Sequence, residues 1–160
     1  MAVALYAGSF DPIHLGHLGV VEQATRAYDE VVVAVVANPQ KASGMFTPEE
    51  RVQLVNDATA HLSGVRSTHF YGLTVDLARR EGATVLLRAA HKEQSSELSM
   101  AATNRLIAGI PTILVHAGPR TRAISSSLVR QLITAGKLTA AQELVPPCVA
   151  RALAEVQPRM

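Results

Sequence analysis

The stretch of the sequence best suited to chemistry is GSFDPIHLGH, residues 8–17. His14 and His17 stand three residues apart around Gly16, soon after a short apolar run at residues 3–7. Glycine lets a ligand approach the backbone, and the first N–H groups of a helix can bind an anion. The stretch matches neither the dinucleotide fingerprint nor the P-loop. It therefore indicates either a phosphate site of another kind or no site.

Two other interpretations of the histidine pair are open. A His-x-x-His pair can bind a metal ion, but the sequence has no Cys or acidic cluster with ligand spacing to complete such a site. Two histidines can equally cap a helix for structural reasons alone. Anion binding is favoured because three further segments suited to phosphate follow other strands.

The first of these segments holds Lys41, in NPQKASGMF, and the second ends in Arg88, after the apolar run TVLL. The third is ISSS, with Ser125, Ser126 and Ser127 ahead of a helix. A lone loop lysine is usually a solvated charge, and serines there are often ordinary N-caps. Serine hydroxyls and helix N–H groups also suit a polyphosphate, and a strand-terminal arginine suits an anion.

The elements that must position these residues alternate along the chain. Apolar and β-branched runs predict strands, and spacing of three to four between apolar residues predicts helices. Five strands alternating with helices predict one α/β domain over residues 1–160, with a doubly wound parallel sheet that binds ligands at the carboxyl ends of its strands. The expected strands are 3–7, 30–38, 65–70, 84–89 and 111–117, and the expected helices are 17–30, 47–62, 74–81, 95–108, one that begins in the serine run and ends at Gly136, and 147–156.

Composition limits the class of protein. The 48% hydrophobic and 18% charged content is typical of a compact globule, and a net charge of +2 gives no reason to expect a nucleic-acid partner. The single cysteine, Cys148, cannot form an internal disulfide, which favours a reducing compartment. The first residues lack the pattern of a signal peptide, and no run is long enough to span a membrane. We expect a cytoplasmic protein without a membrane partner.

Further stretches make a resemblance recognisable. They are NPQKASGMFTPEERVQLV (38–55), GLTVDLARREGATVLLR (72–88), ISSSLVRQL (124–132) and LVPPCV (144–149). Together with residues 8–17, they resemble the HxGH/TxGH nucleotidyltransferases, and most closely the bacterial phosphopantetheine adenylyltransferases. The histidine motif marks the superfamily, whereas the lysine segment and the serine run are more specific to this branch.

The resemblance implies a Rossmann-like nucleotidyltransferase fold and transfer of AMP from ATP to 4′-phosphopantetheine. The expected products are dephospho-coenzyme A and pyrophosphate, with Mg²⁺ accompanying ATP and no metal ligands assigned in the chain. The resemblance also implies a homo-oligomer, a hexamer. Two alternatives stay open: a paralogous nucleotidyltransferase that uses another phosphorylated acceptor or CTP, and a non-catalytic nucleotide-binding relative.

The resemblance also implies residue roles. His17, Lys41 and Arg88 are the expected catalytic residues. The nucleotide is expected to contact Ser9, Phe10, His14, His17, Arg88, His91, Glu97, Ser125, Ser126 and Ser127. The acceptor is expected to contact Ser9, Lys41, Leu73, Arg88 and Asn104.

Three departures from the family pattern fall in regions that recognise substrates. A second arginine is expected three residues after Arg88, where this chain has His91, and a neutral imidazole binds an anion less strongly than a guanidinium. Lys92, Arg120 or Arg122 could replace that charge. The family's D-F-E-Y-E stretch has no counterpart here, and its usual aromatic residue before ISSS is replaced within PRTRA.

Overall fold

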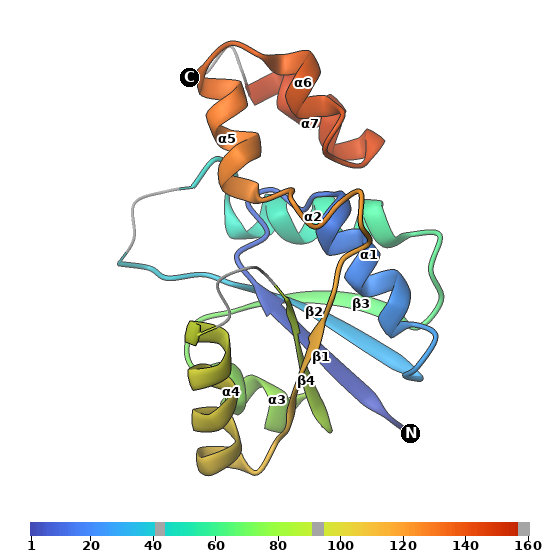
Figure 1. Ribbon diagram of the computed structural model, residues 1–160, viewed down its shortest axis with the longest axis vertical. Helices are drawn as coiled ribbons and strands as arrows, with labels where there is room; N and C mark the ends of the chain where they lie inside the picture. The colour runs from blue at the N-terminus through green and yellow to red at the C-terminus, as the bar shows by residue number, and fades with distance from the viewer. Residues whose placement is uncertain (41–43, 91–94, 157–160) are drawn as a thin grey trace.

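The computed structural model describes residues 1–40, 44–90 and 95–156, in which strands and helices alternate (Figure 1). The elements in chain order are β1 (Val3–Gly8), α1 (Leu15–Ala24), β2 (Glu30–Val36), α2 (Pro48–Thr59), β3 (Val65–Phe70), α3 (Thr74–Arg80), β4 (Val85–Ala89), α4 (Ser95–Ala108), β5 (Thr112–Val115), α5 (Ser126–Thr134), α6 (Leu138–Gln142) and α7 (Pro147–Val156).

The five strands form one parallel sheet in the order β3-β2-β1-β4-β5. Leu5 of β1 lies beside Val32 of β2 on one side and Leu86 of β4 on the other. The chain therefore winds outward from β1 in both directions, and the switch point lies between the carboxyl ends of β1 and β4. The predicted doubly wound α/β fold is confirmed.

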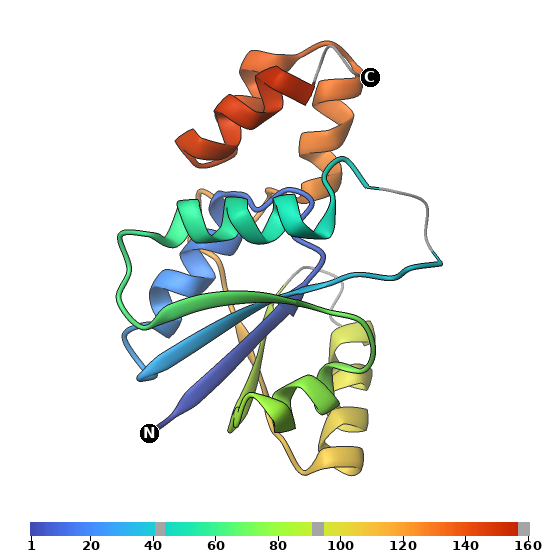
Figure 2. The ribbon, with the colours of Figure 1, turned by 180° about the vertical axis from the view of Figure 1, so that it is seen from behind.

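Helices cover both faces of the sheet. Figures 1 and 2 show α1 and α2 on one face, α3 and α4 on the other, and α5 to α7 stacked beyond α2. The strands bury side chains in two directions accordingly. In β2, Val31, Val33 and Val35 join the core under α1 and α2, whereas Val32 and Ala34 join the core under α3. Strands buried on both faces are continuous apolar runs in the sequence, and β2 is such a run.

Three local details refine the sequence expectations. The helix expected at 17–30 begins at Leu15, because His14 caps it, and ends at Ala24. Thr47 caps α2 in a capping box with Glu50, as the sequence indicates. Gly136 ends α5 with a φ of 72°.

The short helix α6 was not predicted. Within the described residues, none of the helices is long and apolar enough to span a membrane.

Candidate active site

The start of α1 is organised by the two histidines. Nδ1 of His14 accepts hydrogen bonds from the backbone N–H groups of Gly16, at 3.0 Å, and His17, at 3.3 Å. Nδ1 of His17 accepts one from the backbone N–H of His14, at 3.2 Å. A ring nitrogen that accepts a hydrogen bond carries no proton, so each neutral imidazole carries its proton on Nε2. The N–H donor of each neutral ring is therefore on Nε2, the nitrogen that does not cap the helix.

Ring contacts fix the orientation of His17. Its ring stacks on the buried His14 ring, with centroids 3.7 Å apart, and meets the edge of Phe10 at 4.7 Å. Phe10 in turn packs edge-on against Tyr6, at 5.2 Å. The expected nucleotide residue Phe10 is only 1% exposed. Its ring therefore belongs to the core and supports His17.

Gly16 is required by close packing at this helix start. A Cβ atom at this position would lie 2.8 Å from Cε1 of His14 and 3.1 Å from the backbone oxygen of Thr121. The turn that contains Thr121 therefore packs against the first turn of α1. Arg120 and Arg122, on either side of Thr121, are both exposed.

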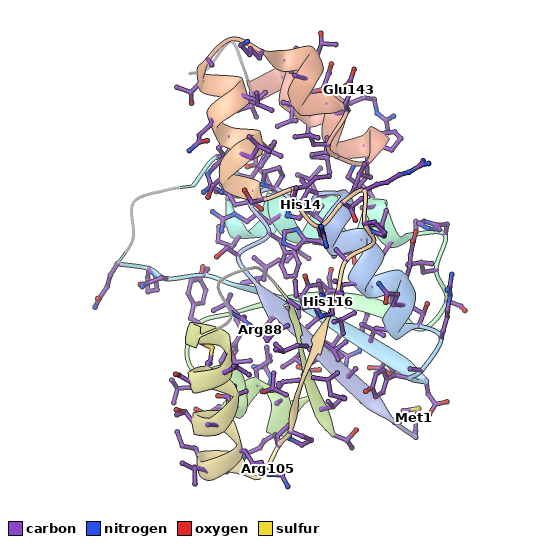
Figure 3. All side chains as sticks on the ribbon, in the orientation of Figure 1. Met1, His14, Arg88, Arg105, His116 and Glu143 are labelled. Carbon is purple, nitrogen blue, oxygen red and sulfur yellow. The ribbon has the colours of Figure 1, made fainter. Side chains whose placement is uncertain are left out.

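Arg88 lies at the carboxyl end of β4, at the switch point. Its Nη1 donates a hydrogen bond to the backbone oxygen of Ala7, the neighbouring residue of β1, at 3.0 Å. A small cavity of about 110 Å³ lies here, and both Arg88 and His17 line it. Figure 3 shows Arg88 beside the sheet and His14 above it, in the layer that holds α1 and α2. An imidazole and a guanidinium thus meet where an α/β sheet binds its ligands.

The serine run binds α5 to the loop that follows β1. Ser125 is the N-cap, and its hydroxyl accepts a hydrogen bond from the backbone N–H of Leu128 at 3.1 Å. The Ser126 hydroxyl donates to the backbone oxygen of Pro12, at 2.9 Å. The Ser127 hydroxyl accepts from Nη2 of Arg130, at 3.1 Å. The N-capping alternative is therefore confirmed for Ser125, and the start of α5 adjoins the histidine loop.

The remaining residues expected at the site lie in separate elements of the fold or outside the described residues. Ser9 is exposed beside Phe10, in the same loop. Leu73 precedes α3 and is 63% exposed, and Asn104 is half-buried within α4. Lys41, His91 and Lys92 lie outside the described residues, and only the backbone of Glu97 is described, in α4.

Sequence reasoning missed a buried ion pair in the same region. Asp11 is 5% exposed and Arg51 is 9% exposed, with Nε of Arg51 3.4 Å from Oδ1 of Asp11. The signal is present in α2, where Arg51 shares a buried face with Leu54, Val55 and Ala58. A charged residue at an apolar-face position requires a buried partner of opposite charge.

Cys148 is no candidate nucleophile. It lies in α7, and burial raises the pKa of its thiol. A raised pKa disfavours the thiolate, which is the reactive form.

A parallel sheet with a histidine and an arginine at its switch point provides a ligand site suited to phosphate. The family model for cytidylyltransferase-like proteins matches residues 5–132. A solved structure titled a putative nicotinate-nucleotide adenylyltransferase from Vibrio parahaemolyticus is similar with a TM-score of 0.67, at 19% identity over 96% of this chain and 99% of that one. A lipopolysaccharide core biosynthesis protein from Thermoplasma volcanium is similar with a TM-score of 0.54, at 18% identity over 74% of this chain and 97% of that one. At these identities, the two likenesses define the fold.

Sequence relatives define the family more narrowly. This chain is 46% identical over 137 residues to the phosphopantetheine adenylyltransferase of Gloeobacter violaceus, covering 84% of each chain. It is 42% identical to that of Symbiobacterium thermophilum, over 97% and 96% of the two chains, and 38% identical to that of Corynebacterium diphtheriae, over 97% and 98%. The chain belongs to the phosphopantetheine adenylyltransferase family.

Proposed function

We propose that this chain transfers the adenylyl group of ATP to 4′-phosphopantetheine, which yields dephospho-coenzyme A and pyrophosphate. The observation that carries the proposal is the cavity at the switch point, lined by His17 and Arg88 in a chain of this family. Imidazole and guanidinium N–H groups are donors suited to phosphate oxygens. Both reactants of this transfer bring phosphates to the site.

The reaction joins two phosphates and requires no covalent enzyme intermediate. An oxygen of the acceptor phosphate attacks the α-phosphorus of ATP, and the bond from that phosphorus to the β-bridging oxygen breaks. Pyrophosphate leaves with the electron pair. Catalysis of such a step consists of aligning the reactants and stabilising the charge that develops on them.

The N–H donors at the site suggest a role for each residue. His17, held by its capping bonds with its proton on Nε2, stabilises the α-phosphate in the transition state, and His14 fixes the tautomer and orientation of His17. Arg88 neutralises the acceptor phosphate. The start of α5 holds the β- and γ-phosphates. The remaining assignments extend from the family: Ser9 and Lys41 for the acceptor phosphate, Leu73 and Asn104 for the pantetheine arm, and His91 and Glu97 for the nucleotide. Phe10, which was expected at the nucleotide, supports the His17 ring instead.

We expect Mg²⁺ to enter as its complex with the triphosphate. This ion retains several waters and commonly binds through substrate phosphates. Among the side chains that line the cavity, those of His17 and Arg88 offer N–H donors, which suit phosphate oxygens. In the described part of the chain, no group of three or more His, Cys, Asp or Glu side chains could hold a metal ion. The ion's contribution is to neutralise charge on the departing pyrophosphate.

Two features of the family extend to assembly and compartment. We propose that the chain assembles into a hexamer and acts in the cytoplasm. Light scattering coupled to size-exclusion chromatography gives the mass directly. A mass six times that of the chain supports the assembly, and a monomer at micromolar concentration contradicts it.

Pyrophosphate release tests the reaction. The purified protein is assayed with ATP or CTP, each paired with 4′-phosphopantetheine or with another phosphorylated acceptor such as nicotinate mononucleotide. We expect turnover with ATP and 4′-phosphopantetheine and, by mass spectrometry, dephospho-coenzyme A as the product. A higher kcat/KM with CTP or with another acceptor would identify the paralogous activity. No turnover with any pair, despite nucleotide binding, would indicate a non-catalytic relative.

A further inference from the structure

We propose that Asp11 is a positioning residue that fixes the acceptor side of the site to its nucleotide side. Asp11 lies in the loop between β1 and α1, which also carries Ser9 and Phe10. Its side chain binds the segment Gly44–Phe46, which follows the expected acceptor residue Lys41 in the sequence. The inference rests on the proposed function for the roles of these two sides.

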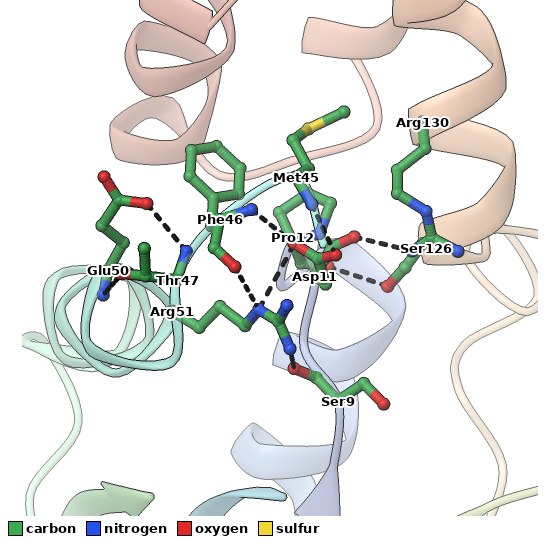
Figure 4. A network of polar contacts seen from close by, with 10 residues as sticks. All are labelled: Ser9, Asp11, Pro12, Met45, Phe46, Thr47, Glu50, Arg51, Ser126 and Arg130. Atoms are coloured by element: carbon green, nitrogen blue, oxygen red, sulfur yellow. Dashed lines mark hydrogen bonds and ion pairs between the residues drawn. The ribbon is translucent and has the colours of Figure 1, made fainter. Parts of the chain in front are cut away.

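The carboxylate of Asp11 is bound to the backbone of this segment. Oδ2 accepts a hydrogen bond from the backbone N–H of Met45 and Oδ1 accepts one from that of Phe46, both at 2.9 Å (Figure 4). The Asp11 side chain is only 7% exposed. Buried hydrogen bonds to an ionised acceptor are stronger than those between neutral groups. One side chain thus holds two consecutive peptide groups of a distant segment.

Arg51 joins the same two segments from α2. Its Nε donates to the backbone oxygen of Phe46 at 2.8 Å, and its Nη1 donates to the backbone oxygen of Ser9 at 3.4 Å. In α2, Arg51 directly follows Glu50 of the capping box that begins the helix. The guanidinium therefore compensates the buried charge of Asp11 and holds residues 9 and 46 together.

A third segment meets the backbone of the same loop. Nη1 of Arg130 donates to the backbone oxygen of Asp11 at 2.7 Å, and the Ser126 hydroxyl donates to that of Pro12 at 2.9 Å (Figure 4). The backbone of residues 11 and 12 thus binds the start of α5, whereas the Asp11 side chain binds residues 45 and 46. A substitution of the Asp11 side chain therefore disturbs the bonds to residues 45 and 46 and leaves the backbone bonds to α5 in place.

Sequence distance links this joint to acceptor binding. Lys41 precedes Gly44 by three residues, and three peptide steps span at most about 11 Å. Before Lys41 in the sequence, the backbone N–H of Ala37 donates to the backbone oxygen of Phe70 at 3.1 Å and fixes the chain at the end of β2. A shift of residues 44–46 therefore moves one of the two fixed points between which the chain carries Lys41. We infer that Asp11 sets the affinity for the acceptor more than the affinity for ATP.

Gly44 provides a second way to disturb the joint without removing a charge. A Cβ atom at this position would collide with the Asp11 carboxylate and with Nη2 of Arg51. Gly44 is exposed and lies outside any helix or strand. Alanine here must displace the segment from the ion pair while Asp11 and Arg51 both remain.

The test compares Asp11→Asn, Gly44→Ala and a control. Asparagine keeps the shape of Asp11 but places an NH₂ group where one backbone N–H now finds an acceptor. Glu30→Gln removes the negative charge from an ion pair at the opposite end of the sheet, where Nε of Arg66 lies 2.6 Å from Oε1 of Glu30. For each protein, KM for 4′-phosphopantetheine, KM for ATP, kcat and the melting temperature are measured.

We expect both joint variants to raise KM for the acceptor about tenfold or more and to lower kcat, with KM for ATP within about twofold of the parent. The control should keep all three kinetic constants. Unchanged acceptor KM, or equal increases in both KM values, would overturn the proposal and leave Asp11 with a structural role. Should Asp11→Asn fail to fold, Gly44→Ala decides alone. A parent protein without turnover would refute the proposed function before any variant is compared.

Discussion

The two ends of the sheet each carry a network of charged side chains. One network binds backbone groups, and the other joins charged side chains to one another. At the carboxyl end, the side chains of Asp11 and Arg51 are buried and bind backbone groups of two segments, at residue 9 and at residues 45–46. At the amino end, Arg66 binds Glu30 at 2.6 Å and Glu81 at 2.7 Å, with its own side chain 46% exposed. There, charged side chains bind one another near solvent.

This difference shows how similar ion pairs can serve different purposes. An exposed pair contributes little to stability, because water and salt screen it. A buried pair contributes little net stability either, but its loss leaves an uncompensated charge, so it fixes geometry. The expected substrate groups, His17 and Arg88, lie at the carboxyl end with the buried pair. Substitutions of the buried pair or of the substrate groups at that end should therefore change kinetic constants, and substitutions in the amino-end network should change stability alone.

The largest expected effect comes from His17→Ala. We expect kcat to fall about 10²- to 10³-fold with little change in ATP affinity, because the contact strengthens in the transition state. Steady-state kinetics and calorimetric titration of ATP measure the two quantities. His61→Ala is the matched control, since His61 is an exposed histidine that follows α2. A proportional loss of ATP affinity with kcat retained would make His17 a ground-state binding residue.

Arg88→Lys should give the next largest effect. Lysine keeps the positive charge but loses the planar pair of donors, so the acceptor phosphate is bound less well. We expect KM for 4′-phosphopantetheine to rise about 10- to 100-fold, as expected for one charged hydrogen bond, and kcat to fall. Arg79→Lys, on the exposed side of α3, provides the control. A rise in KM for ATP alone would place Arg88 on the nucleotide.

Thr47→Ala should lower stability without changing the kinetic constants, although Thr47 lies at the carboxyl end of the sheet. The Thr47 hydroxyl accepts a hydrogen bond from the backbone N–H of Glu50 at 3.1 Å and caps α2. Its loss should cost about 1 kcal/mol and lower the melting temperature by about 2–4 °C. Both KM values should stay unchanged, because α2 remains anchored by the Arg51 contacts. A kinetic change without a loss of stability would contradict this separation.

The smallest effect is expected at the amino end, from Glu81→Gln. Its hydrogen bond with Arg66 lowers the pKa of the Glu81 carboxyl, against an opposing contribution from burial. A lowered folded-state pKa gives stability that is present above the unfolded pKa and is lost as pH falls through the folded pKa. The parent should therefore melt at most about 3 °C above the variant at pH 7, and the two should converge below pH 4. A difference that persists at pH 3 would exclude this ionisation as the cause.

The sequence predicted the framework better than the joints between its parts. β-branched runs identify strands such as β2 because both faces are buried, and the sheet's topology then brings His17 and Arg88 together. Asp11 and Arg51 were missed because their partners are mostly backbone groups 34 to 42 residues away, which no local pattern encodes. The helix α6 was missed because it spans five residues and has no side-chain cap. The end of α1 was misplaced because its polar continuation still has helical spacing.

The central claim is that the carboxyl end of the sheet joins two phosphates. It is tested most directly by comparing two acceptors that differ by one phosphate, 4′-phosphopantetheine and pantetheine, with the parent protein and saturating ATP. The account predicts rapid pyrophosphate release with the first and almost none with the second, because Arg88 and its neighbours bind a charge that only the first carries, and because that phosphate supplies the attacking oxygen. Efficient turnover of pantetheine would contradict the account.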